Sequence, residues 1–252
     1  MKKASANNGL FLKGLDDGVA AVVRRAHNSA FWKMLLDRDT KPKQAESLLR
    51  ELYLEAYSYF EDVFEAAALI VARFPKSSPA MVPRLLKHLA DEADHGELSL
   101  QAHVCLGGDE NRARSARISP GAFNVAAFWR GLAVMEDPFC YLGAMYLFES
   151  STPQFSTDIL KVMDRYEMRS GADAHAAEHV KVDVAHAKLF RDLIEAASND
   201  PRQAESIRFG FEAFAAFYPE AIFDEAFRRA TRSDGSFKRP AIKPWYRSTA
   251  AI

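Results

Sequence analysis

Residues 179–186 read HVKVDVAH and set two histidines and one aspartate four and three residues apart. On an α-helix, steps of three, four and seven residues return to nearly the same face. His179, Asp183 and His186 are therefore expected to point in one direction. Their small and apolar neighbours indicate a partly buried helix, where a carboxylate is costly unless it is paired or bound to a metal. The stretch predicts a helix that carries ligand-type side chains into the protein.

Residues 88–95, HLADEADH, repeat this pattern with His88, Glu92 and His95. A lone histidine on a helix is usually exposed or satisfied by its surroundings, so one such pattern would carry little weight. Two patterns in one chain, with six of the seven histidines in or beside them, are much less easily accidental. Imidazole and carboxylate ligands on facing helices are typical of non-haem iron or manganese sites. Together the two stretches predict a metal site.

The rest of the chain has the periodicity of helices. Apolar residues recur at spacings of three and four, and strand-like alternation bounded by hairpin turns is nearly absent. We predict one all-α domain over residues 1–252, with about seven helices and an irregular tail from about residue 233. The expected helices span residues 16–37, 43–74, 79 or 83–107, 120–150 with a kink at Pro138, 156–168, 172–197 and 201–232. Residues 109–119 are expected to form a polar loop.

Composition narrows the class of protein. The formal net charge of −1 gives no electrostatic reason to expect a nucleic acid or an anionic membrane as partner. No stretch approaches eighteen uncharged apolar residues, so we expect no membrane span. Two cysteines, Cys105 and Cys140, make neither a disulfide framework nor a zinc ligand set. With no signal-peptide pattern at the start of the sequence, a cytoplasmic protein is expected.

A dinuclear site needs carboxylates from further helices. Glu149 is the best candidate, because it follows the apolar run of residues 141–148. Glu61 lies near the face that carries Tyr57 and Phe64, but it could equally be a solvated partner of a basic residue.

Two families have comparable ligand patterns. The ferritin-like di-iron proteins use a glutamate and a Glu-x-x-His pair twice, which leaves His179 unexplained and requires Asp183 to replace a glutamate. The chain more closely resembles the haem-oxygenase-like di-iron oxidases, whose last ligand helix carries His-x-x-x-Asp-x-x-His. The residues that carry this resemblance are Glu92, His95, Glu149, His179, Asp183 and His186. Glu92 and His95 are three apart, as in the alkene-forming fatty-acid decarboxylases of that family. His88 is then not needed as a ligand, and it either supports the ligands or is unrelated to the site.

The resemblance implies a haem-oxygenase-like helical fold over nearly the whole chain. It also implies that these six residues bind two Fe(II) ions, with manganese as an alternative, and that O₂ is the co-substrate. A peroxo-type diferric species would then oxidise a small carboxylate-bearing substrate, either an amino acid or a fatty acid. Whether the outcome is decarboxylation, desaturation, fragmentation or N-oxygenation stays open. A homodimer and an external electron donor also stay open.

Relatives of the same fold suggest two other chemistries. Thiaminase-like members use a cysteine nucleophile, for which Cys140 is the candidate, and haem oxygenases use a histidine of the first helix, where His27 lies. Neither chemistry would need the six candidate metal ligands. A third alternative is a metal-binding helical bundle without catalysis, which O₂ consumption by the ferrous protein would distinguish from an oxidase.

If the substrate carries a carboxylate, we expect a basic side chain of the protein to bind it. The arginines considered for this role are Arg50, Arg73, Arg130 and Arg208. The aromatic stripe of Tyr53 and Tyr57 and the phenylalanines after Phe209 could line a pocket, although such stripes more often belong to a core.

Overall fold

The protein is described by a computed structural model that covers residues 2–74, 78–135, 137–168, 171–232 and 236–238, with side chains from residue 8 onward. These residues form helices and no β-strand beyond an isolated bridge between Thr231 and Phe237. The helices are α1 (Lys2–His27), α2 (Ala30–Leu36), α3 (Pro42–Val71), the short 3₁₀ helix η2 (Pro79–Met81), α4 (Val82–Glu92), α5 (His95–Cys105), α6 (Glu110–Ser115), α7 (Pro120–Val134), α8 (Cys140–Arg165), α9 (Ala174–Ala197), α10 (Pro201–Ala215) and α11 (Glu220–Ala230). The predicted all-α class is confirmed, and the expected tail from about residue 233 falls largely outside the described residues.

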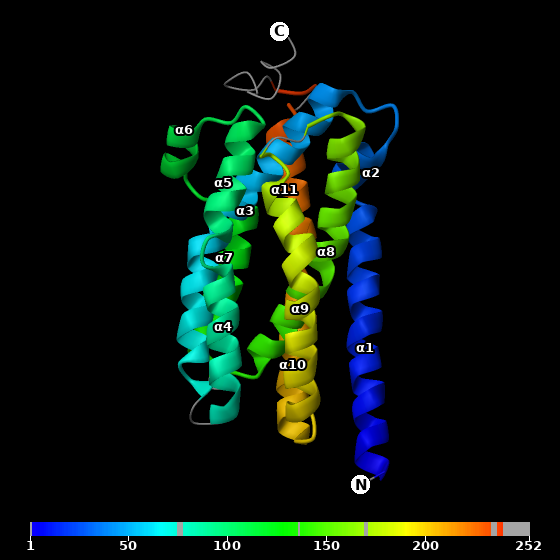
Figure 1. Cartoon of the computed structure of the whole chain (residues 1–252), viewed down its shortest axis with the longest axis vertical. Helices are drawn as coiled ribbons and strands as arrows, with labels where there is room; N and C mark the ends of the chain where they lie inside the picture. Colours follow the sequence, from blue (N-terminus) through cyan, green and yellow to red (C-terminus); the bar gives the residue numbers. More distant parts are fainter. Residues whose placement is uncertain (1, 75–77, 136, 169–170, 233–235, 239–252) are drawn as a thin grey trace.

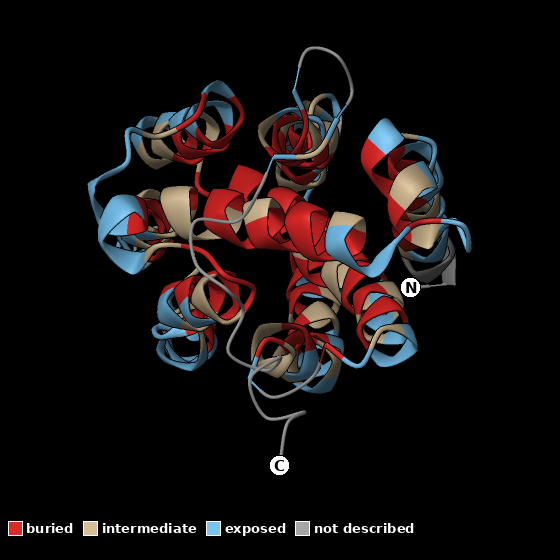
Figure 2. Cartoon of the chain, turned by 90° about the horizontal axis from the view of Figure 1, so that it is seen from above, coloured by how far each residue is buried: buried red, intermediate tan, exposed pale blue. Residues whose placement is uncertain are grey.

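The long helices lie side by side along the long axis of the molecule (Figure 1). One group is centred on α8, which packs against α9 and α10, and the other on α3, which packs against α5, α7 and α11. Viewed from above, buried residues face the middle of the bundle and exposed residues face outward (Figure 2). One hydrophobic core joins the two groups. None of the described helices is both long and apolar enough to cross a membrane.

The helix predicted over residues 16–37 is two helices, and the first begins much earlier than expected. The chain leaves the helical conformation at Ser29, whose backbone is extended and whose hydroxyl accepts a hydrogen bond from the backbone N–H of Trp32. This is the arrangement of an N-cap, which supplies a partner to an otherwise unsatisfied donor of the first turn. Trp32 and Leu35 are then buried in the core by the short helix α2.

Prolines at two places act differently from the prediction. Pro138 does not kink one helix but lies between α7 and α8, while α8 continues through Pro153 to Arg165 and includes the helix expected at 156–168. Burial of Phe155 and Ile159 in the core stabilises this continuation.

Two further differences are a helix inside an expected loop and a break in an expected helix. The expected loop of residues 109–119 contains α6, which Asp109 caps by accepting a hydrogen bond from the backbone N–H of Arg112 at 2.9 Å. The last predicted helix is divided into α10 and α11.

Helices α8 and α10 approach each other closely through two glycines. A Cβ atom on Gly143 would lie 1.9 Å from the carbonyl oxygen of Ile207, and one on Gly210 would lie 1.9 Å from that of Cys140. Only glycine therefore fits at either position. This contact fixes α8, the helix that carries Glu149, within the bundle.

Candidate metal centre

The first ligand pattern spans a break between two helices. His88 and Glu92 belong to α4, and His95 is the first residue of α5. The prediction of one continuous helix here was therefore wrong. The linking residues Ala93 and Asp94 keep right-handed helical backbone angles, so the side chains still converge. His95 Nδ1 lies 2.6 Å from Glu92 Oε2, and His88 Nε2 lies 4.0 Å from Glu92 Oε1.

Glu149 and His186 complete a compact group with this segment. His88 Nε2 lies 2.9 Å from Glu149 Oε1, and His186 Nδ1 lies 3.1 Å from Glu92 Oε1 and 3.5 Å from Glu149 Oε2. One ligand atom from each of His88, Glu92, Glu149 and His186 lies within 4.8 Å of the others. Three of the four residues are buried and Glu92 is nearly so, which is the placement expected of an enclosed metal site.

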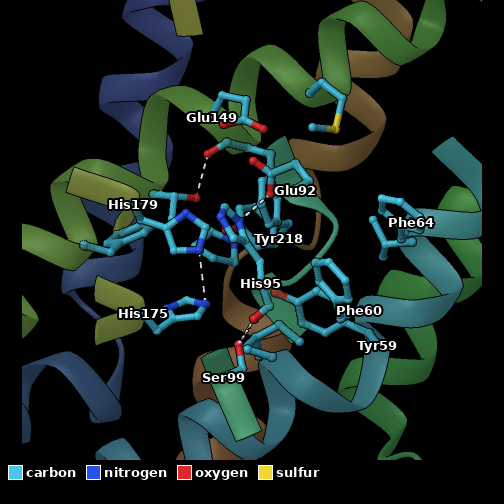
Figure 3. Close-up of a pocket in the computed structure, with 18 of the residues that line it drawn as sticks. Tyr59, Phe60, Phe64, Glu92, His95, Ser99, Glu149, His175, His179 and Tyr218 are labelled. Carbon is cyan, nitrogen blue, oxygen red and sulfur yellow. Dashed lines mark hydrogen bonds and ion pairs between the residues drawn. The ribbon is translucent and has the colours of Figure 1, made fainter. Parts of the chain in front are cut away.

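Two further predicted ligands, His179 and Asp183, lie beside this group and contact each other. Both carboxylate oxygens of Asp183 lie 3.0 Å from His179 Nδ1. On the other side of the ring, His179 Nε2 lies 3.1 Å from His175 Nε2 (Figure 3). The rings of His95 and His179 are 4.6 Å apart, so this second group adjoins the first. For His179 to bind a metal, one of its two ring contacts must be given up.

Polar atoms without hydrogen-bond partners in and beside the compact group indicate that this region fits a metal ion. Glu92 Oε1, His88 Nδ1, His95 Nδ1 and His186 Nδ1 are buried and make no hydrogen bond of acceptable geometry in the described part of the chain. Buried polar atoms normally have partners. A divalent cation with oxygen and nitrogen ligands would supply them, and this ligand set suits iron or manganese better than thiolate-preferring metals.

Without a metal, the charges of the cluster compensate one another. Burial opposes a charge on His186, yet the nearby carboxylates of Glu149 and Glu92 raise the pKa of that imidazole to about 10. Burial likewise opposes ionisation of Glu149, but His88 and His186 hold the pKa of this carboxyl below its usual value. Burial and the nearby Glu149 raise the pKa of Asp183 to about 6. A proton on His186 therefore balances carboxylate charge that a metal cation would otherwise balance.

An elongated apolar cavity of about 120 Å³ runs along the cluster. Its lining extends along α3 from Leu52 to Ala67, a length of about 22 Å at 1.5 Å per residue, and includes Phe60 and Phe64 (Figure 3). We call this cavity the channel. Among the described residues, no lysine or arginine lines it.

Two tyrosine hydroxyls provide polar groups in this channel. The hydroxyls of Tyr53 and Tyr141 are buried and have no hydrogen-bond partner within the described residues. Burial raises the pKa of both phenols well above the usual value, so each keeps its proton. Each hydroxyl can therefore donate a hydrogen bond to a bound molecule.

The four arginines proposed to hold a substrate carboxylate lie elsewhere. Arg73 donates to the carbonyl oxygen of Ala133, and Arg130 pairs with Asp62 and Glu65. The other two are also away from the channel, because Arg208 lies over the ring of Phe11 and Arg50 lines a different cavity.

The residues on which the alternative hypotheses depended lie outside the channel. Glu61 is exposed and does not line the channel, so the ferritin-like ligand set is incomplete. Cys140 is buried outside the channel, and burial raises the pKa of its thiol to about 11, which is unfavourable for a nucleophile. His27 pairs with Asp158 and lies outside the channel lining.

Two histidines of this region, His88 and His175, were not predicted as metal ligands from the sequence. His88 is part of the compact group, and its place in the pattern of residues 88–95 was the available signal. His175 precedes His179 by four residues on the same helix face, which is also a pattern visible in the sequence.

Comparisons with known proteins agree with the fold and the ligand chemistry. A family model described as an iron-containing redox enzyme matches residues 50–218. A 4-aminobenzoate synthase from Chlamydia pneumoniae is 22% identical over 169 residues, which cover 64% of this chain and 75% of that protein.

Solved structures resemble the whole bundle. A domain of unknown function with a heme oxygenase-like fold from Shewanella denitrificans aligns with a TM-score of 0.75 at 20% identity, covering 86% of this chain and 92% of that chain. A TenA homologue from Pseudomonas syringae aligns with a TM-score of 0.67 at 13% identity, covering 86% and 91% of the two chains. The haem-oxygenase-like fold expected from the sequence is confirmed.

Proposed function

Because this chain belongs to the family of iron-containing redox enzymes, we propose that it is a non-haem di-iron oxidoreductase that uses O₂ to oxidise a small organic molecule. The observation that carries the proposal is the buried group of His88, Glu92, Glu149 and His186 at the wall of an apolar channel. A redox metal beside a space for an organic molecule is the minimum that such an enzyme requires.

The two groups of side chains would hold the two metal ions. His88, Glu92, Glu149 and His186 would bind the first ion, and the adjoining His95, His179 and Asp183 would bind the second. When bound, iron supplies the electrons for the reduction of O₂, and manganese is the alternative metal. The carboxylates balance the positive charge of the ions in a site from which bulk water is excluded.

The channel would hold the substrate by its apolar part. Phe60, Phe64 and Ile159 offer apolar contacts, and the free hydroxyls of Tyr53 and Tyr141 can donate hydrogen bonds to a polar group. With no lysine or arginine among the described lining residues, a substrate carboxylate would have to be neutralised at the metal ions. The apolar lining favours the alkyl chain of a fatty acid over a zwitterionic amino acid.

The similarity to a 4-aminobenzoate synthase supports an enzyme of small-molecule metabolism, since that relative is named for a small carboxylic acid. We place the enzyme in the cytoplasm as part of the proposal. An external electron donor would be required if the oxidation of substrate does not itself supply all the electrons that O₂ takes up.

Oxygen consumption tests the proposal. Anaerobically purified protein loaded with Fe(II) should consume O₂ faster than the same amount of free Fe(II), and medium-chain fatty acids should change that rate more than amino acids do. Glu149→Ala should lose the activity, whereas Glu61→Ala, which changes an exposed glutamate outside the site, should keep it. If loaded wild-type protein consumes no O₂ in excess of free iron, the protein is a metal-binding bundle without catalysis.

A further inference from the structure

A second cavity of about 390 Å³ is lined by residues of α6 and of the C-terminal end of α5. These two segments lie near one end of the bundle (Figure 1). Residues 50–54 of α3 and the last turn of α11 complete its wall. Its lining contains more cations than carboxylates. The cationic residues are Arg50, Arg112, Arg228, Arg229 and Lys238, and the carboxylates are Glu51 and Asp109.

Both carboxylates are already engaged by the chain. Glu51 Oε1 lies 3.1 Å from Arg50 Nη2, and its other oxygen lies 3.6 Å from Arg229 Nε. Asp109 caps α6 through the backbone N–H of Arg112. Neither carboxylate is left to neutralise the guanidinium of Arg112 or the ammonium of Lys238, which are exposed and form no ion pair within the described residues.

Arg50 is the residue that points to a ligand. Its side chain is only 4% exposed, and it donates hydrogen bonds to Ser47 and Glu51 through Nη2 and Nε. The remaining nitrogen, Nη1, is buried without a hydrogen-bond partner in the described part of the chain. Leaving a charged donor buried and unsatisfied is costly, so an acceptor at this position would stabilise the protein.

We propose that this second cavity binds a small organic molecule that carries a phosphate group. Guanidinium groups donate paired hydrogen bonds to phosphate oxygens, and several cations can share the charge of one phosphate. The volume is greater than a phosphate group needs and lies in the range of sites for small organic ligands. The cavity therefore has room for an organic part next to the phosphate.

The phosphate site is separate from the metal centre. His95 of the metal centre and His103 of the second cavity both belong to α5, and eight residues of helix correspond to about 12 Å. His103 is held in place by a hydrogen bond of 2.8 Å between its Nδ1 and the carbonyl oxygen of Arg50. Binding at this site requires neither iron nor turnover, so it can be tested on the metal-free protein.

Isothermal titration calorimetry at constant ionic strength tests the proposal with adenosine monophosphate and inorganic phosphate as probes. We expect adenosine monophosphate to bind saturably at one site per chain, and inorganic phosphate to bind more weakly. Arg112→Glu should weaken the binding of adenosine monophosphate at least about tenfold, because it reverses a charge at the rim. Arg112 is exposed, so this variant should fold like the wild type.

Lys181→Glu is the matched control, since it makes the same charge change on a side chain that is 76% exposed and outside the cavity. Its affinity should equal that of the wild type. The proposal is overturned if neither probe binds saturably, or if Arg112→Glu and Lys181→Glu bind adenosine monophosphate equally well. Equal affinity of the wild type for the two probes would also overturn it, because the site would then not recognise an organic part.

Discussion

Glu55 is a buried carboxylate that belongs to neither cavity lining. It has no exposed surface, accepts a hydrogen bond from the hydroxyl of Ser119, and lies 3.1 Å from Arg229 Nε. Burial raises the pKa of this carboxyl to about 7, although Ser119 and Arg229 act in the opposite direction. Because the pKa is higher in the folded than in the unfolded protein, the group favours folding below pH 4.5 and loses that contribution as the pH rises through about 7.

Glu55→Gln removes this titration. Between pH 5 and pH 8, the free energy of unfolding of the wild type should therefore fall relative to that of the variant, by at most about 3 kcal/mol. Urea unfolding of both proteins at the two pH values measures the difference. Parallel pH profiles would mean that Glu55 does not titrate in this range.

His88 is the residue at which the structure adds most to the sequence interpretation. Glu149 could be predicted as a ligand, because a glutamate that follows so apolar a run is expected to be buried. A buried carboxylate needs a charged partner or a metal ion. His88 could not be assigned, because the resemblance relied on the spacing of Glu92 and His95. Its contact with Glu149 joins residues 61 positions apart, which only the packing of α4 against the bundle reveals.

His88→Ala should lower the affinity for Fe(II) by about 10- to 100-fold, whether His88 binds the ion or orients Glu149. A competition titration against a chromophoric chelator under anaerobic conditions measures this affinity. Glu61→Ala serves as the control and should bind like the wild type, because Glu61 is exposed. Unchanged affinity in His88→Ala would remove His88 from the metal centre.

At the scale of the elements, periodicity predicted which segments are helical better than where helices break. The ends of α3 and α9 lie within a few residues of the predicted ends. The breaks after Glu92 and His27 could not be predicted, because they depend on how the following residues pack. Ser29 is a recognisable N-cap only once Trp32 is known to be buried behind it.

The contact between α8 and α10 gives a prediction about stability. Gly210→Ala should lower the free energy of unfolding by about 1–3 kcal/mol, because the new methyl group would collide with the backbone of Cys140 and push the helices apart. Gly131→Ala is the matched control, since nothing lies within 4 Å of a Cβ at this helical position. Alanine there should stabilise the protein by about 0.5–1 kcal/mol. Thermal or urea unfolding compares the two variants, and equal effects would contradict the close helix contact.

At the scale of the whole molecule, the all-α class and the ligand chemistry followed from the sequence, but the two cavities did not. Arg50 was one of four arginines considered for a substrate carboxylate, and nothing in its local sequence separates it from the others. Tyr53, three residues further along the same helix, faces the apolar channel, whereas Arg50 faces the cationic cavity. Which residues of α3 line which cavity depends on the helices that pack on either side of α3.

Metal binding should stabilise the whole bundle, because the proposed ligands come from α4, α5, α8 and α9. Fe(II) at a concentration of about 100 times the dissociation constant should add about 2.7 kcal/mol to the free energy of unfolding. Anaerobic thermal unfolding should show a higher midpoint with Fe(II) for the wild type and little change for Glu149→Ala. An equal shift in both proteins would place the stabilising ion elsewhere.

Anaerobic Fe(II) titration followed by metal analysis determines whether two iron ions bind to one buried set of ligands. We predict about two Fe(II) per chain for the wild type, the second more weakly held because His179 must first release Asp183 or His175. Asp183→Ala should reduce the uptake to about one. Uptake of one iron by the wild type, unchanged in Asp183→Ala, would contradict the two-iron centre.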